Sequence, residues 1–313
     1  MSDSVTAFAP ASIGNVAVGF DMLGLALANV GDRVSARRTD TPGVTLAEVR
    51  GIDGELHPYL SAKAEENTAS IAAQALWEVY GTEGGVELKV YKGVPLQSGM
   101  GSSAASAVAG VVAANALLKK PLANELLLPY ALEGEKYASG GVHADNVAPS
   151  LLGGMIFCPR VLLPETIRLA VPDGVSSVLL HPDLQVNTAQ ARKGLARGVA
   201  MKQWLSQQGY MGAFITACAA SDLSMISKSL KDVVIEPQRT AAVSCFDAVK
   251  QAAERSGALG FSLSGSGPSL FALCESSKAG NLSTAMEQAC RGQGIQCESW
   301  VSPMDAPGAH LVD

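Results

Sequence analysis

Two glycines and two serines stand directly before a long uncharged segment, in the sequence GVPLQSGMGSSAASAVAGVVAANALL at residues 93–118. Glycine lets a backbone approach a ligand closely, and the first turn of a helix presents unpaired N–H groups at the positive end of the helix dipole. This combination is typical of a phosphate-binding site, beside which a serine hydroxyl could reach a phosphate-bound Mg²⁺. On the glycines alone, an ordinary turn with a helix cap is an equally good interpretation.

Two common phosphate-binding motifs do not fit this segment. A P-loop requires a lysine after the last glycine, and none follows here. Gly99 to Ala104 matches G-x-G-x-x-A, but residues 95–98 separate it from the preceding predicted strand, and the flanking segments do not form a βαβ series. Nicotinamide chemistry is therefore disfavoured. The polar start and the Ala/Ser content of the segment favour a tightly packed helix over a membrane span.

The elements that position this loop are predicted from periodicity and turn signals. Strands are predicted at residues 5–9, 20–27, 33–37, 44–49, 86–91, 155–158, 177–180, 260–263, 269–274 and 297–302. Helices are predicted from a cap at Asn67 or Thr68 to residue 81, after the glycine loop to 118, at 122–137, over most of 188–231, at 240–255, and up to 291. Grouped strands and helices indicate an α+β fold, with a change of pattern near residues 159–172.

The composition excludes several classes of function. The chain has 313 residues and a net charge of −6, so we expect no broad basic surface for nucleic acid or an anionic membrane. Its six cysteines are scattered without zinc-ligand spacing, which indicates free thiols in a reducing compartment. No segment resembles an export signal, and we therefore expect a cytoplasmic protein.

Three segments resemble the signatures of the GHMP small-molecule kinases. They are PASIGNVAVGFDMLGLAL at residues 10–27, PLQSGMGSSAA at 95–105 and FSLSGSGPSLFAL at 261–273, and they lie in the order that the family shows. The resemblance implies two domains. Residues 1–165 would form an ATP-binding domain like domain 2 of ribosomal protein S5, and residues 166–313 a ferredoxin-like domain. Members are frequently homodimers.

Four features resemble the branch of this family that phosphorylates the side-chain hydroxyl of L-homoserine, on the route to threonine, with ATP and Mg²⁺. These features are GNVAVGFDMLG at residues 14–24, SGGVHADNVAPSLLGG at 139–154, the pair Thr188 and Arg192, and EPQR at 236–239.

The resemblance implies roles for individual residues on the nucleotide side. The implied ATP contacts are Asn67, Pro95, Gly99, Met100, Gly101, Ser102, Ser103 and Ala104. Ser103 and Glu135 would hold Mg²⁺, and with Asn15 they would form the catalytic group. Apart from the family, Glu135 fits a solvated helix face beside Lys136, and Asn67 fits a helix cap.

The acceptor should be a small zwitterion. The implied acceptor-binding residues are Asn15, Asp21, His143, Asn146, Thr188, Arg192, Arg239 and Gly265. Arginine can hold a carboxylate through two parallel hydrogen bonds, and Asp21 would accept from an ammonium group. Each arginine alone fits a surface position, Asp21 also fits a turn, and His143 also fits a hydrogen-bonded structural role.

The general base has no clear candidate. Several family members use an aspartate where this chain has Asn146, and an amide does not accept a proton usefully. Asp145 is expected to point elsewhere. We therefore expect transfer without a dedicated base. Two alternatives stay open: another small alcohol such as mevalonate or shikimate as acceptor, or a binding module of the same fold without turnover.

Overall fold

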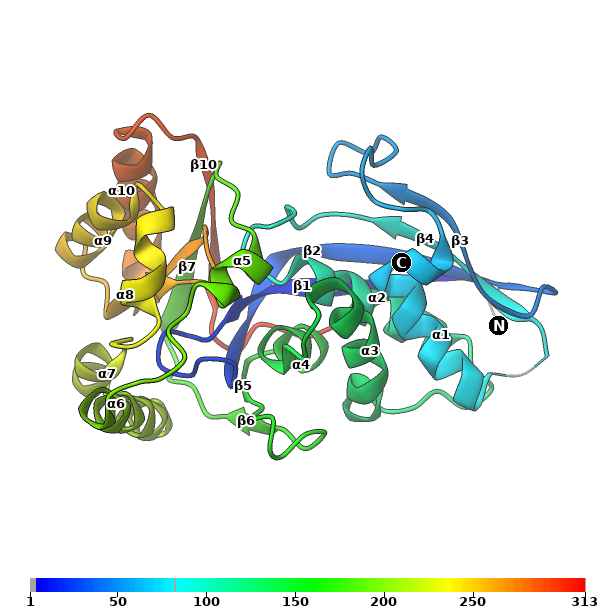
Figure 1. Ribbon diagram of the computed structural model, residues 1–313, viewed down its shortest axis with the longest axis horizontal. Helices are drawn as coiled ribbons and strands as arrows, with labels where there is room; N and C mark the ends of the chain where they lie inside the picture. The colour runs from blue at the N-terminus through cyan, green and yellow to red at the C-terminus, as the bar shows by residue number, and fades with distance from the viewer. Residues whose placement is uncertain (1–3, 82, 313) are drawn as a thin grey trace.

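Two β-sheets with their covering helices make up residues 4–81 and 83–312, which a computed structural model describes except for the side chains of residues 139, 188 and 189. Figure 1 shows the two sheets toward opposite ends of the long axis, with the long strand β2 running between them.

The first sheet contains seven strands within the described residues, in the order β11-β1-β2-β4-β3, with β5 on β2 and β6 on β5. All of its pairings are antiparallel except that of β3 with β4. Its strands are β1 (Ser4–Gly14), β2 (Leu23–Thr39), β3 (Gly43–Arg50), β4 (Gly85–Tyr91), β5 (Met155–Phe157), β6 (Ile167–Leu169) and β11 (His310–Val312).

Four helices pack against this sheet around one apolar core. They are α1 (Thr68–Tyr80), α2 (Ser102–Ala116), α3 (Leu128–Ser139) and α4 (Ala144–Leu152), with short 3₁₀ turns η1 (Ala64–Glu66) and η2 (Asn124–Leu127). α2 is buried along almost its whole length, which confirms the predicted packed helix. Within the described ranges, no helix combines the length and apolar character needed to cross a bilayer.

The second sheet has the order β10-β7-β9-β8 and is antiparallel throughout. Its strands are β7 (Val175–Pro182), β8 (Gly260–Leu263), β9 (Leu270–Glu275) and β10 (Cys297–Pro303). Helices α9 (Phe246–Arg255) and α10 (Ala279–Arg291) cover one face. In chain order this is the β-α-β-β-α-β arrangement of a ferredoxin-like domain, as predicted.

The second sheet's other face packs against the first domain. Phe271 and Leu273 of β9 share a core with Leu25 of β2 and with Phe214 of α6. The remaining elements here are α5 (Thr188–Lys193), α6 (Met201–Ala219), α7 (Leu223–Ser229), α8 (Glu236–Arg239), η3 (Thr240–Ala242) and η4 (Ser276–Lys278). This shared core places the loops of the two domains side by side.

The α+β class is confirmed, but some elements differ from the prediction. The strand predicted at 20–27 begins only at Leu23 and continues without a break to Thr39. Residues 15–22 form a loop, because Asn15, Val16, Ala17 and Asp21 have positive φ angles that no strand allows. The domain boundary at 165/166 stays a prediction. Strands β6 and β11, which follow that boundary in sequence, pair in the first sheet.

Candidate functional site

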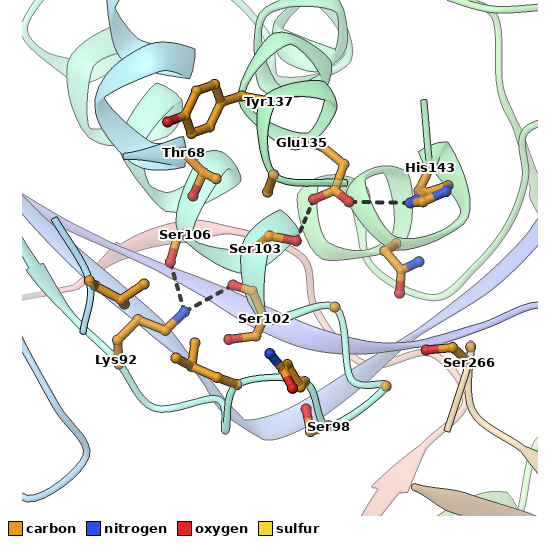
Figure 2. A pocket seen from close by; sticks show the side chains of 18 of the residues that line it. Thr68, Lys92, Ser98, Ser102, Ser103, Ser106, Glu135, Tyr137, His143 and Ser266 are labelled. Carbon is orange, nitrogen blue, oxygen red and sulfur yellow. Dashed lines mark hydrogen bonds and ion pairs between the residues drawn. The ribbon is translucent and has the colours of Figure 1, made fainter. Parts of the chain in front are cut away.

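A cavity of about 460 Å³ opens at the N-terminus of α2, between the start of α1, α3 and the loop of residues 264–267. Its size lies in the range of small-molecule sites. Figure 2 shows side chains from these elements pointing toward it. The residues that line it include Asn67, Thr68, Lys92, Gly99, Gly101, Ser102, Ser103, Ser106, Glu135, His143, Asn146, Gly265 and Ser266.

The glycine loop is held in a conformation that requires its glycines. Gly99 and Gly101 have φ angles of +77° and +68°, in the left-handed region. A Cβ atom at Gly99 would lie 2.5 Å from Ser264 O, and one at Gly101 would lie 2.5 Å from Ser12 Oγ. Gly101 caps α2 with no side-chain hydrogen bond to the first turn. The N–H groups of that turn therefore face the cavity mouth as an anion site.

A buried ion pair lies beneath the loop. Lys92 Nζ contacts Asp32 Oδ2 and donates to Ser102 O at 2.9 Å and to Ser106 Oγ at 2.8 Å. Asp32 Oδ1 accepts from the N–H groups of Gly93 and Val94, at 2.8 and 3.0 Å. The pair therefore fixes both the start of the loop and the first turns of α2, as the dashed contacts of Lys92 in Figure 2 partly show.

Ser103 and Glu135 meet at the cavity wall. Ser103 Oγ donates to Glu135 Oε2 at 2.6 Å, and Glu135 Oε1 lies 3.4 Å from His143 Nδ1 (Figure 2). Glu135 is only 3% exposed, so the solvated helix face is the wrong interpretation. The hydrogen bond to Glu135 raises the pKa of His143 against the opposing effect of burial.

This donor set fits Mg²⁺ as part of a shared site. The described residues contain no group of three or more His, Cys, Asp or Glu side chains arranged to hold a metal ion. One carboxylate and one hydroxyl, adjacent to an anion-binding helix terminus, match a cation that takes its remaining ligands from phosphate oxygens and water.

The loop of residues 15–22 lies beside the cavity with α4, α5, α8 and Gly265. We call this group the acceptor region, because the family resemblance predicts that it holds the phosphoryl acceptor. The Asn15 amide crosses this region, since its Oδ1 accepts from Asp21 N at 3.0 Å and its Nδ2 donates to Gly265 O at 3.0 Å. Gly265 N donates to Gly14 O at 3.1 Å. A left-handed φ at Val16 is strained for a β-branched residue, and such strain is concentrated at functional sites.

The two arginines of this region differ in their hydrogen-bond partners. Arg192 donates to both oxygens of Asp21, at 2.8 and 2.6 Å, and this hydrogen bonding raises the pKa of Arg192. Arg239 is buried, and its Nη1 donates to Gly265 O at 2.8 Å. Its Nε is buried with no hydrogen-bond partner in the described part of the chain. Burial, and then the charge of Arg192, lower the pKa of Arg239.

Asp145 and Asn146 both lie against the Gly14–Asn15 backbone. Asn146 Oδ1 accepts from Ser12 Oγ at 3.1 Å, whereas Asp145 Oδ2 accepts from Asn15 N at 3.2 Å. Asp145 thus faces the acceptor loop, contrary to the expectation that it points elsewhere. Burial and the nearby charge of Asp21 raise its pKa to about 7, and its Oδ1 is buried with no partner among the described residues.

Comparisons with known proteins agree with this geometry. The family model for the GHMP kinases N terminal domain matches residues 67–154, and the model for the GHMP kinases C terminal domain matches residues 201–292. A homoserine kinase from Xanthomonas campestris pv. campestris is 41% identical over 307 residues, covering 98% of this chain and 93% of the relative.

The chain belongs to the GHMP kinase family. A second relative, a homoserine kinase from Chlorobium phaeobacteroides, is 39% identical and covers 99% of both chains. The crystal structure of homoserine kinase from Cytophaga hutchinsonii matches with a TM-score of 0.94 at 40% identity, covering 100% of this chain and 98% of that one. The mevalonate kinase of L. major, solved with R-mevalonate, shares the fold at 15% identity, with a TM-score of 0.69 and coverage of 96% and 95%.

Most of the predicted site residues of this GHMP kinase lie either at the cavity or in the acceptor region. On the nucleotide side the cavity is lined by Asn67, Gly99, Gly101, Ser102, Ser103 and Glu135, together with His143, Asn146 and Gly265. Asn15, Asp21, Arg192 and Arg239 meet in the acceptor region. Asn67 caps α1 as well, because its Oδ1 accepts from Ala69 N at 3.0 Å.

Three predicted residues, Pro95, Met100 and Ala104, are not among those that line the cavity. Met100 and Ala104 are fully buried in the core beside the loop. The Pro95 carbonyl accepts from Ser98 Oγ at 2.7 Å and so shapes the loop. Thr188 begins α5, but its side chain lies outside the described residues.

Three residues of the site escaped prediction from the sequence. Asp32 lies within β2 and Lys92 directly follows β4. A charge at a buried position of a sheet needs a partner, and this is the signal that could have paired them. Phe20 lies between Arg192 and Arg239, and no sequence pattern indicated that contact.

Proposed function

We propose that this GHMP kinase transfers the γ-phosphoryl group of ATP to the side-chain hydroxyl of L-homoserine, giving O-phospho-L-homoserine and ADP. The observation that carries the proposal is the pairing of an anion-binding helix terminus with an adjacent region of both acidic and cationic side chains. The two named homoserine kinases and the Cytophaga hutchinsonii structure support the same acceptor.

The nucleotide would bind in the cavity at the start of α2. The N–H groups of residues 102–104 would hold its phosphates, and Asn67 would contact the adenosine end. Ser103 and Glu135 would hold Mg²⁺, which when bound neutralises phosphate charge. Because this chain is acidic overall and Lys92 is paired with Asp32, the positive potential that ATP requires would come from the local N–H groups and from Mg²⁺.

The acceptor would lie against the loop of residues 15–22. Arg239 has an unpartnered Nε and no neighbouring carboxylate bonded to it among the described residues, so a substrate carboxylate would satisfy it. The ammonium group would bind Asp21, in exchange for part of its contact with Arg192. His143, Asn146 and Thr188 would line the same acceptor site. Mevalonate and shikimate lack an ammonium group, which makes them poorer matches.

We propose that the transfer needs no dedicated base. The acceptor hydroxyl oxygen would attack the γ-phosphorus, the bond to the β–γ bridging oxygen would break, and the hydroxyl proton would pass to the transferred phosphoryl group. Asp145 Oδ1 is buried and its Oδ2 is bonded to Asn15 N. His143 Nδ1 lies 3.4 Å from Glu135 Oε1, the carboxylate that would hold Mg²⁺. Asn15 would position the hydroxyl.

A coupled ADP-release assay over a panel of alcohols tests the proposal. With ATP and Mg²⁺, L-homoserine should give ADP at a rate far above the acceptor-free background, while mevalonate and shikimate should not. Activity with mevalonate or shikimate instead would assign another acceptor. Silence across the panel with measurable ATP binding would indicate a non-catalytic binding module.

We also propose a cytoplasmic location and a homodimer. The six cysteines, all within the described residues, are free and buried, which suits a reducing compartment. The homodimer rests on the family resemblance, and light scattering after size-exclusion chromatography would distinguish a 32.2 kDa monomer from a species of twice that mass.

A further inference from the structure

Phe20 lies between the two arginines of the acceptor region. Its ring centroid is 5.4 Å from Arg192 Cζ and 5.3 Å from Arg239 Cζ. A guanidinium within about 6 Å of an aromatic ring is attracted by the ring's electrons. One ring therefore contacts cations from two separate helices, α5 and α8.

This arrangement opposes the mutual repulsion of two like charges. Arg192 has a counter-charge, because both of its terminal nitrogens donate to Asp21. Arg239 lacks that help, since its hydrogen bond goes to the neutral Gly265 carbonyl and its buried Nε is unpartnered within the described ranges. Before an anion binds, the Phe20 ring contacts Arg239 directly and stabilises it beside Arg192, in addition to the charges of Asp21, Asp232 and Asp145.

The backbone around Phe20 is conformationally strained. Asn15, Val16 and Ala17 before it, and Asp21 after it, have φ angles between +42° and +68°. Gly19 N donates to Asn15 O at 2.9 Å, and Leu23 N donates to Gly19 O at 2.9 Å, so the loop is closed on itself. The dipeptide Phe20–Asp21 thereby engages Arg192 through both its ring and its carboxylate.

We propose that Phe20 is a positioning residue that keeps Arg192 and Arg239 together as a preformed clamp for the carboxylate of the acceptor. The inference rests on the proposed function, because the carboxylate is that of the amino-acid substrate. Phe20 acts through the arginines, so it governs acceptor affinity and leaves nucleotide binding and the chemical step unchanged. A leucine fills similar space without the ring's attraction for a cation, whereas a tyrosine retains it.

Steady-state kinetics of Phe20→Leu and Phe20→Tyr test the assignment. We expect Phe20→Leu to raise KM for L-homoserine about tenfold, consistent with the loss of two partly desolvated cation contacts. We expect kcat and KM for ATP to stay within about twofold of wild type, and Phe20→Tyr to restore the homoserine KM to within about threefold. Phe8→Leu is the matched control, because Phe8 contacts Arg33 at 5.4 Å on the first sheet. It should leave all three constants unchanged.

Three outcomes would overturn the assignment: an unchanged homoserine KM in Phe20→Leu, an equal rise in the KM for ATP, or a Phe20→Tyr variant as impaired as Phe20→Leu. Phe20→Met is measured in parallel, with thermal unfolding of every variant, so that a folding defect in one substitution does not decide the result. Failure of the wild-type protein to release ADP with homoserine would overturn both the proposed function and this assignment. The variant outcomes above, obtained with an active wild-type protein, would overturn the assignment alone.

Discussion

The two halves of the site differ in how their polar groups are satisfied. On the nucleotide side, Lys92 has three partners, Asp32 binds two loop N–H groups, and Ser103 is bonded to Glu135. In the acceptor region, Asp145 Oδ1 and Arg239 Nε are buried without a hydrogen-bond partner. Among the described residues, these two are the buried side-chain nitrogen and oxygen atoms that lack one.

Because of this difference, we expect the two halves to contribute to different properties: one to the stability of the folded protein and the other to its affinity for the acceptor. Groups that the protein satisfies internally hold the glycine loop in shape whether or not a ligand is present. Buried groups left unsatisfied beside a strained loop cost free energy until a ligand completes them. Substitutions on the nucleotide side should therefore lower stability or turnover, and substitutions in the acceptor region should mainly change acceptor affinity.

The largest effect is expected from Lys92→Met. Removing the lysine leaves Asp32 as an uncompensated buried charge, which typically costs about 3–5 kcal/mol in the free energy of unfolding. Urea denaturation measures this loss, and adding Asp32→Asn, which keeps acceptors for the loop N–H groups, should recover part of it. Lys89→Met is the control, because the Lys89–Glu48 pair is partly exposed and should contribute less than about 1 kcal/mol. A loss of similar size in both lysine variants would contradict the structural role of the buried pair.

The second-largest effect is expected from Glu135→Gln, which should lower kcat. The amide keeps the shape and a hydrogen bond to Ser103 but removes the negative charge that would hold Mg²⁺. We expect kcat to fall about 10²–10³-fold, the effect of losing one group that stabilises charge in the transition state. ADP release is measured across a range of Mg²⁺ concentrations, with Glu133→Gln on the exposed side of the same helix as the control. A kcat within threefold of wild type would remove Glu135 from the catalytic group.

Arg239→Ala should affect acceptor affinity alone. Loss of a charge-assisted hydrogen bond worth about 1.5–3 kcal/mol predicts a homoserine KM raised roughly 10–100-fold. The KM for ATP should stay within about twofold. Thermal unfolding of the variant is measured in parallel to detect a folding defect, because Arg239 is buried and packs on Phe20. Arg37→Ala, on the exposed face of β2, is the control, and equal weakening of ATP and homoserine would show that Arg239 is misplaced in this account.

Asp145 should also make the stability of the folded protein depend on pH. Its pKa rises from 3.8 in a free carboxyl to about 7 in the folded protein, so the folded state keeps a proton that the unfolded chain releases. The free energy of unfolding therefore falls as the pH rises from about 4 to about 7, by at most about 1.4 kcal/mol per pH unit. The charged groups that act on Asp145 are Asp21, His143 and Glu135.

Asp145→Asn removes this contribution while keeping an acceptor for Asn15 N. The variant should match wild type near pH 4 and exceed its stability at pH 8, as denaturation at each pH would measure. Turnover should be largely retained, because the proposed transfer uses no base. A variant with normal affinities and lost turnover would identify Asp145 as the base, and parallel stability profiles would exclude its titration.

The sequence predicted the nucleotide side of the site better than the acceptor region. The glycine pair and the following helix are local in sequence, so their conformation follows from a few adjacent residues, and α2 begins where the motif placed it. The ferredoxin-like domain followed from the family resemblance. The ion pair of Lys92 with Asp32 joins two strands, and no local pattern specified it.

The strand predicted at residues 20–27 includes the end of the acceptor loop, because that segment is mostly apolar. Most apolar side chains of residues 16–27 are buried, and Phe20 and Met22 are half-buried. Asn15 and Asp21, however, hydrogen-bond across the loop and hold left-handed φ angles that override strand propensity. Asp21 lies in a turn, as one interpretation predicts, and pairs with Arg192. Its contact with an ammonium group stays a prediction. The contact of Phe20 with two arginines depends on tertiary packing between the domains.

The central claim is that the two halves act on one substrate pair, ATP and homoserine. The most direct test is ³¹P NMR of the wild-type protein with ATP, Mg²⁺ and L-homoserine. The account predicts a phosphomonoester resonance that coincides with authentic O-phospho-L-homoserine and grows in step with ADP. ADP accompanied only by inorganic phosphate, or no change in the ATP resonances, would contradict it.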